Sequence, residues 1–170
     1  MDYKKHIREV PDFPKKGILF YDITTLLMNP EAFDSIIDEM ANRIKDLKIT
    51  KIAAIEARGF IFGAPLAQKL SKPFIPIRKP GKLPYKTVKY EYSLEYGTDA
   101  IEIHEDAVNK GDNILLVDDL LATGGTIKAA TALVEECGGL VAGCLFAIEL
   151  DFLKGKQGLN DHRVESIIHY

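Results

Sequence analysis

The chain has 170 residues, of which 46% are hydrophobic and 28% are charged, and its formal net charge is −3. This length and composition are typical of one globular domain with a sizeable core. The negative net charge argues against a general attraction to nucleic acid or to an anionic membrane surface. No apolar stretch has the length of a signal peptide or a membrane span, and the spacing of Cys137 and Cys144 matches no metal-binding motif. We therefore expect a cytoplasmic protein whose cysteines are reduced.

Helical and extended patterns alternate along the chain from its N-terminus. The opening residues up to about Val10 suit a short amphipathic helix, which Pro11 and Pro14 would stop, and the segment PDFPKKGILFYDIT reads as a loop with short extended pieces. Asn29 and Pro30 suit an N-cap and a first helical position, and apolar residues recur at helical spacing from there to position 47. We therefore expect a helix over about 30–47.

Short apolar runs rich in strand-forming residues follow. They lie at 51–56, 73–78, 113–119 and 140–150, with a last one near 164–170, and helical patterns occupy 59–70 and 125–137. VKYEYSL and TDAIEIH alternate as a hairpin that turns at 95–97. Apolar strands that alternate with helices predict an α/β fold, with a central, mainly parallel sheet flanked by helices. Such sheets bind ligands at the carboxyl ends of their strands, so the chemistry should follow Glu56, Arg78 and Asp119.

The most informative motif is LLVDDLLATGGT, residues 115–126. An apolar strand ends in two acids, Asp118 and Asp119, and a short loop then leads into a helix. Small residues and threonines in the loop can turn successive backbone N–H groups toward one point at the positive end of the helix; they are Ala122, Thr123, Gly124, Gly125 and Thr126. The pattern predicts a site for a phosphate monoester. The alternative is a strand-to-helix turn in which the acids are helix caps.

The two acids have the wrong charge to bind a phosphate. A carboxylate accepts hydrogen bonds from two neighbouring hydroxyl groups, so Asp118 and Asp119 suit a sugar. Acids beside phosphates also suggest Mg²⁺, held mainly by phosphate and water, with Asp118 or Asp119 as the candidate protein ligand. No GxxxxGK[ST] or GxGxxG fingerprint follows a strand, which argues against a typical ATPase or dinucleotide site.

The segment VDDLLATGGT resembles the phosphoribosyl pyrophosphate (PRPP) signature of the type I phosphoribosyltransferases. In that family the acids hold the ribose hydroxyls and the loop holds the 5-phosphate. The resemblance implies the type I phosphoribosyltransferase fold in a single domain over 1–170. About 1–30 would include a small hood over the base, and about 79–97 would be a mobile β-hairpin loop.

A basic interval precedes this motif. No carboxylate occurs between Glu56 and Glu91, and this local segregation of charge predicts a site for a polyanion. Four basic residues lie at or just after predicted strand ends and are assigned to the site: Arg58, Arg78, Lys79 and Lys82. A solvated surface position is the better interpretation for Lys69, Lys72 and Lys89, and Lys86 is left open.

The segment EARGF, residues 56–60, resembles the pyrophosphate-binding turn of the same family. The resemblance implies that Ala57 and Arg58 bind pyrophosphate together with Arg78, Lys79 and Lys82. Relatives often have a non-proline cis peptide in this turn, which here would join Glu56 to Ala57. Serine is frequent in relatives at the position of Ala57, a departure that leaves Arg58 unaffected. Arg58 is also a predicted catalytic residue, because the departing pyrophosphate needs its growing charge neutralised.

Three further segments resemble the adenine phosphoribosyltransferases within that family: FPKKGILFYDIT, RKPGKLPYKT and YSLEYG. The resemblance implies that Phe20 stacks on adenine, while backbone groups of Leu19 and Tyr21 meet the polar edge of the base. Ordinary core packing is the alternative for Phe20. Relatives commonly have a basic residue at the position of Tyr21, a change that a backbone contact would tolerate.

Glu95 and Tyr96 lie in the predicted mobile loop and are the other candidate catalytic residues. The resemblance places Glu95 near the base and Tyr96 by the reacting sugar. Glu95 could take or relay a proton from the imidazole ring of the purine, and it could equally be a solvated hairpin residue.

The reaction implied by the resemblance is transfer of phosphoribose from PRPP to adenine, which yields AMP and pyrophosphate in purine salvage. It would proceed by displacement at the ribose anomeric carbon with Mg²⁺. One alternative is a phosphoribosyltransferase for another purine, and a second is a regulator that binds PRPP without transferring it. The resemblance also implies a homodimer with small-molecule partners, and neither nucleic acid nor membrane is expected as a partner.

Overall fold

The computed structural model describes residues 1–93, 97–159 and 161–170. It divides the chain into two compact units, Met1–Glu39 and Met40–Tyr170, which are described separately below. Among the described residues, no helix combines the length and the apolar character needed to cross a membrane.

The first unit is built around an antiparallel hairpin. A 3₁₀ turn (Tyr3–His6) precedes strands β1 (Arg8–Pro11) and β2 (Leu19–Asp22), and the short helix α1 (Thr24–Leu27) and the start of α2 (Pro30–Arg43) follow. The expected opening helix up to Val10 is wrong, because residues from Arg8 onward pair with β2, with Val10 opposite Phe20. The backbone hydrogen bonds of the hairpin outweigh the local amphipathic pattern, and Pro11 is tolerated at the end of an edge strand.

Helix α2 begins where the sequence predicted it. The Asn29 side chain accepts a hydrogen bond from the backbone N–H of Ala32 at 3.0 Å, which confirms the N-cap. The helix ends at Arg43 rather than near 47, and a turn in which the N–H of Leu47 donates to the carbonyl of Ile44 follows it. The apolar spacing therefore continues beyond the helix, because these side chains are buried whether or not the backbone is helical.

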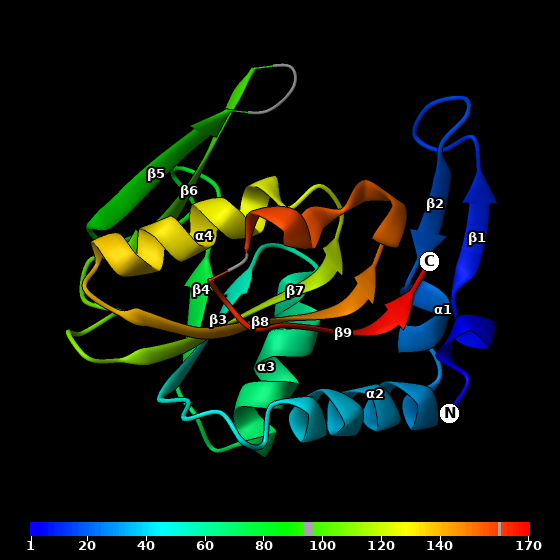
Figure 1. Cartoon of the computed structure of the whole chain (residues 1–170), viewed down its shortest axis with the longest axis horizontal. Helices are drawn as coiled ribbons and strands as arrows, with labels where there is room; N and C mark the ends of the chain where they lie inside the picture. Colours follow the sequence, from blue (N-terminus) through cyan, green and yellow to red (C-terminus); the bar gives the residue numbers. More distant parts are fainter. Residues whose placement is uncertain (94–96, 160) are drawn as a thin grey trace. The chain divides into compact units, whose positions relative to one another are not determined.

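The second unit is a five-stranded parallel sheet with helices and a separate hairpin (Figure 1). Its elements are β3 (Lys51–Ile55), α3 (Gly59–Lys69), β4 (Phe74–Ile77), β5 (Thr87–Ser93), β6 (Thr98–His104), β7 (Asn113–Leu121), α4 (Gly125–Glu136), β8 (Leu140–Glu149) and β9 (Val164–His169). The strand order is β4-β3-β7-β8-β9, and β5 and β6 form an antiparallel pair. The predicted α/β class with a central parallel sheet is confirmed.

Helices cover both faces of this sheet, as Figure 1 shows for α3 and α4. Leu116 and Phe146 belong to a buried cluster that also contains residues of α4 and of the β5–β6 hairpin. Ala54 and Val117 alternate with these side chains and face α3, where Gly63 leaves room for the Ala54 methyl group. Strands buried on both faces explain why the sequence shows continuous apolar runs.

The strand order brings three loops to one edge of the sheet. Strands β4, β3 and β7 are neighbours and run parallel, so the segments that follow them begin side by side. These segments are 56–58 after β3, 78–82 after β4 and 122–124 after β7. Strand β7 continues to Leu121, beyond the predicted end at 119, because it pairs with β8 up to Glu149. Asp118 and Asp119 are therefore strand residues.

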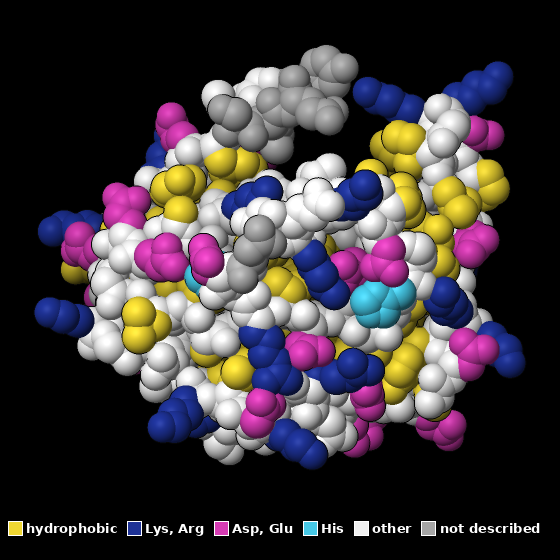
Figure 2. All heavy atoms as spheres, viewed as in Figure 1, with side chains coloured by type: hydrophobic (Ala, Val, Ile, Leu, Met, Phe, Trp, Pro, Cys, Tyr) yellow, Lys and Arg dark blue, Asp and Glu magenta, His cyan; other side chains and the backbone are white. Residues whose placement is uncertain are grey.

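The surface has no large region of one charge on the face shown in Figure 2. Basic and acidic side chains are interspersed there.

Candidate active site

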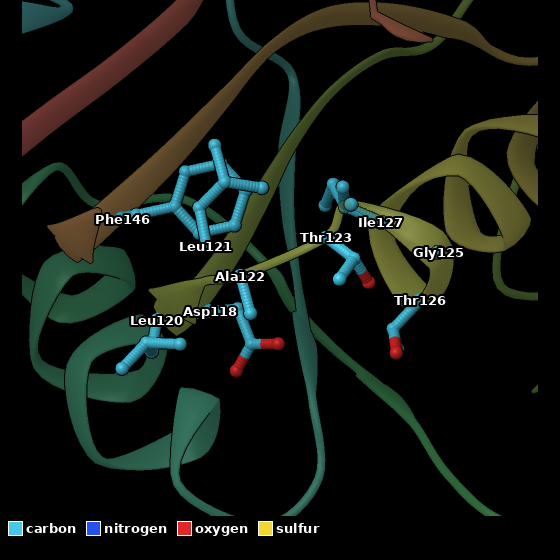
Figure 3. A pocket seen from close by; sticks show the side chains of 10 residues that line it. Asp118, Leu120, Leu121, Ala122, Thr123, Gly125, Thr126, Ile127 and Phe146 are labelled. Atoms are coloured by element: carbon cyan, nitrogen blue, oxygen red, sulfur yellow. The ribbon is translucent and has the colours of Figure 1, made fainter. Parts of the chain in front are cut away.

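The loop between β7 and α4 forms a small hollow. About 80 Å³ in volume, it is lined by Asp118, Phe146 and the run 120–127. Figure 3 shows the Asp118 carboxylate and the hydroxyls of Thr123 and Thr126 pointing to the same side of this segment. Gly124 precedes the first residue of α4 with a φ of 84°, a left-handed conformation that glycine adopts at low cost. A cradle of backbone N–H groups with hydroxyls at a helix N-terminus suits a phosphate monoester.

A second loop packs against this hollow and restricts its backbone. A Cβ atom at Gly124 would lie 2.5 Å from the carbonyl oxygen of Gly155, and a Cβ atom at Gly155 would lie 2.3 Å from the carbonyl oxygen of Ala122. The two loops can approach this closely only because both positions are glycine. Beyond Gly155, Lys156 forms an ion pair of 2.8 Å with the buried Glu149 at the end of β8. The shape of the hollow therefore depends on a segment far away in sequence.

The two acids of the motif have different surroundings. Asp118 lines the hollow, and its Oδ1 accepts a hydrogen bond from the backbone N–H of Asp119 at 2.8 Å. Asp119 is only 5% exposed, and its Oδ2 lies 2.9 Å from Nε of Arg58. Burial, together with the charge of Asp119, raises the pKa of Asp118 well above its usual value. Burial also raises the pKa of Asp119, against the lowering effect of Arg58.

The Arg58–Asp119 ion pair joins two of the loops at this edge. Arg58 directly precedes α3 and belongs to the turn after β3, whereas Asp119 belongs to β7. The peptide bond between Glu56 and Ala57 is cis, as predicted for this turn. Gly59 lets the turn approach β7 closely, because a Cβ atom there would lie 2.8 Å from Oδ1 of Asp118. One cation is thus held directly beside the acid pair.

The segment after β4 brings further cations to the same edge. Nε of Arg78 donates to Oε2 of Glu56 at 2.7 Å, and its Nη1 donates to the carbonyl of Lys82 at 3.2 Å. The Lys79 ammonium group pairs with Asp99 on β6. The side chain of Lys82 is exposed. The cationic loop 78–82 therefore carries Arg78 and Lys79, which pair with carboxylates of the protein, and the exposed Lys82.

Tyr92 and Asp99 connect the hairpin to both loops. They are opposite each other in the β5–β6 register, and the Tyr92 hydroxyl donates to Oδ2 of Asp99 at 3.1 Å. The same hydroxyl lies 3.5 Å from Oγ1 of Thr126. Burial alone would lower the pKa of Lys79, but its hydrogen bond with Asp99 produces a net increase. The hydrogen bond with Lys79 lowers the pKa of Asp99.

The chain is similar to known proteins over most or all of its length. A phosphoribosyl transferase domain model matches residues 22–163. An adenine phosphoribosyltransferase of Pseudothermotoga lettingae is 55% identical over 170 residues, which is 100% of both chains. The crystal structure of an adenine phosphoribosyltransferase from Thermoanaerobacter pseudethanolicus has a TM-score of 0.97 and 53% identity, and the match covers 99% of this chain and 98% of that one. This chain belongs to the adenine phosphoribosyltransferase family.

The family assignment establishes the reaction. Adenine and PRPP are converted to AMP and pyrophosphate, so the enzyme is a pentosyltransferase. A more distant family member, from Trypanosoma brucei, was solved in complex with AMP, pyrophosphate and ribose-5-phosphate. It is 27% identical with a TM-score of 0.89, and the match covers 98% of this chain and 77% of that one.

The residues expected to bind adenine lie in the first unit. Phe20 is half-buried and lines an apolar hollow of about 170 Å³ with Val10, Phe13 and Asp22. The rings of Phe13 and Phe20 meet edge to face, with centroids 5.1 Å apart. Leu19 is 41% exposed, and the pKa of Tyr21 is raised by burial and by the charge of Glu9. Phe20 thus borders a surface hollow rather than lying in the core.

Two of the predicted site residues lie outside the described part of the chain, and some residues near the site were not predicted from the sequence. Glu95 and Tyr96 lie outside the described residues, so their catalytic roles stay predictions. Lys89 pairs with Glu91 at 2.6 Å, and Lys86 lies 3.8 Å from Glu105. Sequence reasoning missed three contributors to the site: Tyr92, Asp99 and Gly155. A hairpin that turns at 95–97 would place Ser93 opposite Asp99, whereas the structure pairs Tyr92 with Asp99. Nothing in the local sequence connects Gly155 to Ala122.

Proposed function

We propose that the carboxyl edge of β4, β3 and β7 is the site where this adenine phosphoribosyltransferase displaces pyrophosphate from PRPP. The observation that supports this assignment best is the 2.9 Å ion pair between Arg58 and Asp119. It places a cation suited to pyrophosphate beside acids suited to a ribose. These two groups of PRPP are joined at the anomeric carbon, so the enzyme needs both kinds of partner within one small region.

The β7–α4 loop is assigned to the phosphate and the ribose. The 5-phosphate would bind the backbone and hydroxyl groups of Ala122, Thr123, Gly124, Gly125 and Thr126, whose segment lines the hollow. Asp118, which also lines the hollow, and Asp119 would accept hydrogen bonds from the ribose hydroxyls. Asp119 would in addition hold Arg58 in place.

The turn after β3 and the cationic loop 78–82 are assigned to pyrophosphate. Ala57 and Arg58 would bind it from the turn, and Arg78, Lys79 and Lys82 would bind it from the loop. The Lys79 ammonium group pairs with Asp99, and pyrophosphate would compete with that carboxylate for it. Cations arranged before the reaction stabilise the charge that develops as the leaving group departs.

Adenine recognition is assigned to the hood, residues 1–30. Phe20 would stack on the base and the backbone of Leu19 and Tyr21 would meet its polar edge, an assignment supported by the apolar hollow beside Phe20. Glu95 would relay a proton from the imidazole ring of the base, and Tyr96 would lie by the sugar. The loop 79–97 would close over the substrates and exclude water that would hydrolyse PRPP.

The donors at the hollow also fit a magnesium ion. Asp118, Thr123 and Thr126 offer oxygen atoms only, and oxygen atoms are the ligands that Mg²⁺ prefers. Asp118 or Asp119 would hold Mg²⁺, with the phosphates and water as its other ligands. Bound there, the ion would neutralise charge on pyrophosphate. The protein's own residues would position the anomeric carbon between adenine N9 and the leaving oxygen.

The assembly and cellular location are further parts of the proposal. Family membership supports a homodimer of single-domain chains. Cys137 and Cys144 form no disulfide, and burial raises the pKa of the Cys144 thiol to about 12, which suits reduced cysteines in the cytoplasm.

Pyrophosphate release tests the proposal. The purified protein is supplied with PRPP and Mg²⁺, and with adenine, hypoxanthine, guanine or xanthine in turn. We expect turnover with adenine only, and we expect Phe20→Ala to raise the KM for adenine at least tenfold while changing the KM for PRPP little. Equal turnover with another purine would contradict the assignment of the hood. An unchanged KM for PRPP in Lys79→Ala and Lys82→Ala would contradict the pyrophosphate assignment.

A further inference from the structure

Glu56 is a largely buried carboxylate directly after β3 that the proposed reaction does not use. Its backbone N–H donates to the carbonyl of Ile77 at 2.9 Å, which places it beside the end of β4. Its side chain is 12% exposed. Each carboxylate oxygen accepts from a different group: Oε2 from Nε of Arg78 at 2.7 Å, and Oε1 from the backbone N–H of Lys79 at 2.6 Å. Glu56 therefore contacts both the side chain and the main chain of the cationic loop.

A second carboxylate anchors the same loop from the hairpin. Arg78 and Glu102 exchange backbone hydrogen bonds of 3.0 and 2.7 Å, and Oε2 of Glu102, which is 9% exposed, accepts from the N–H of Gly81 at 3.1 Å. The main chain is thus held at three positions between 78 and 81. Because this loop has no regular secondary structure beyond a bridge at Arg78, these side-chain contacts determine where its cations lie.

The Glu56 carboxylate interacts with donors of the cationic loop. Burial alone would raise its pKa, but the hydrogen bonds from Lys79 and Arg78 produce a net decrease, so the group is ionised at neutral pH. A buried carboxylate needs such donors, and the two hydrogen bonds meet that need. The peptide bond after Glu56 belongs to the turn that contains Arg58. One residue therefore connects both cationic segments.

We propose that Glu56 is a positioning residue for pyrophosphate: it fixes the spacing between the turn with Arg58 and the loop with Arg78 and Lys79. This role rests on the assignment of pyrophosphate to these segments under Proposed function. Glu56 acts through Arg78 and Lys79 and does not touch the substrate. Without its charge, the loop keeps its cations but loses the contact that holds them at one distance from Arg58.

The test is Glu56→Gln, measured by steady-state kinetics with each substrate varied in turn. The glutamine amide accepts through one oxygen only, and its NH₂ group faces a donor in place of the second. We expect the KM for PRPP and the inhibition constant of pyrophosphate to rise about tenfold or more, since hydrogen bonds to charged groups have effects of this size. The KM for adenine should stay within about twofold, a selectivity that general destabilisation would not produce.

A matched control exists at a distant strand. Glu165 on β9 also accepts from an arginine Nε, that of Arg163, at 3.0 Å. Glu165→Gln removes the same kind of charge from the same kind of pair. The KM for PRPP, the KM for adenine and the inhibition constant of pyrophosphate should all equal those of the wild type. A rise in the KM for PRPP as large as that in Glu56→Gln would overturn the positioning role, because loss of any such pair would then suffice.

A binding measurement keeps the proposal testable if turnover is too low to analyse. Pyrophosphate and adenine are each added to Glu56→Gln, and the shift in melting temperature is recorded. The proposal requires loss of the shift with pyrophosphate and retention of the shift with adenine. A shift in the melting temperature of Glu56→Gln with pyrophosphate that equals the wild-type shift would overturn the proposal. If Lys82→Ala and Lys79→Ala also leave PRPP binding intact, the pyrophosphate assignment fails as well; if they weaken it, only the role of Glu56 fails.

Discussion

The β7–α4 loop and the cationic loop 78–82 meet the same edge of the sheet but are built on different principles. The β7–α4 loop obtains its shape from backbone, with a left-handed Gly124 and a close contact to Gly155. The cationic loop obtains its properties from charged side chains. Glu56 and Glu102 accept hydrogen bonds from its main chain, and Glu56 also accepts one from the Arg78 side chain. A phosphate that stays bound throughout the reaction suits a fixed cradle. A leaving group suits cations that can pair with carboxylates of the protein once the leaving group has departed.

The difference predicts different sensitivities. A site made of backbone N–H groups fails when an added methyl group displaces the chain, and it responds little to salt. A site made of exposed cations fails when charge is removed, and it weakens as ionic strength rises. Arg58 lies in the turn after β3, is ion-paired with Asp119 of β7 and is assigned to pyrophosphate together with the cationic loop, so its loss should have the largest effect.

Arg58→Ala removes that link. We expect kcat/KM for PRPP to fall about 10²–10³-fold, because a cation aimed at developing charge is lost and Asp119 becomes a buried acid without its ion-pair partner. The fall in kcat/KM for PRPP is measured by steady-state kinetics at saturating adenine. Arg163→Ala, which removes an arginine ion-paired with Asp46 and Glu165 far along the sheet, is the control. A loss below about threefold in Arg58→Ala would contradict the assignment.

Gly124→Ala tests the backbone cradle. We expect kcat/KM for PRPP to fall about 10–100-fold, because the new Cβ atom would lie 2.5 Å from the carbonyl of Gly155. Gly111→Ala is matched in backbone conformation, since its φ is 87° and nothing lies within 4 Å of the added atom. Both variants bear the left-handed strain of about 1–2 kcal/mol, and only the first should lose activity. Equal activity of the two variants would show that the cradle tolerates displacement.

Lys82→Gln tests the exposed side of the cationic loop. The KM for PRPP should rise about fivefold at low salt, because a solvated ion pair contributes at most about 1 kcal/mol. The difference from wild type should shrink as salt rises, since the charges are screened. Lys86→Gln provides the comparison, because Lys86 belongs to the same stretch of chain as Lys82 and its ammonium group lies near Glu105. A salt-independent effect of Lys82→Gln would argue against a role through charge.

Asp112→Asn tests an ion pair at the opposite edge of the sheet and should change stability alone. Asp112 pairs with Lys51 at 2.7 Å, and this contact lowers the pKa of its carboxyl. The contribution is therefore present above the unfolded-state pKa of about 3.9 and is lost as pH falls through the lower folded-state pKa. At pH 7 the variant should melt about 2–4 °C below wild type. The gap should narrow as the pH falls below the unfolded-state pKa of about 3.9. Unequal kcat/KM at pH 7 would contradict a purely structural role.

Local chemistry along the chain determined the main strands and helices of this protein and the chemical character of its most informative motif. Apolar periodicity predicted the strands and helices of the sheet, because burial on both faces requires continuous apolar runs. The motif around Asp118 and Thr126 predicted a phosphate loop, since small residues and hydroxyls at a helix N-terminus can turn successive backbone N–H groups toward one anion. The opening helix was wrong because strand pairing between Arg8 and Asp22 is a contact that local propensity does not include.

Only the tertiary structure decided how the charged groups pair. Arg58 with Asp119, Glu56 with Arg78, and Lys79 with Asp99 each join segments that are distant in sequence. The close approach of Gly155 to Ala122 is of the same kind. Sequence pattern reports which side chains are charged or small, but pairing depends on distances that the packing of strands and loops sets. The chemical types at the candidate site were therefore foreseeable, whereas the partners of its charged side chains became evident only once the chain was folded.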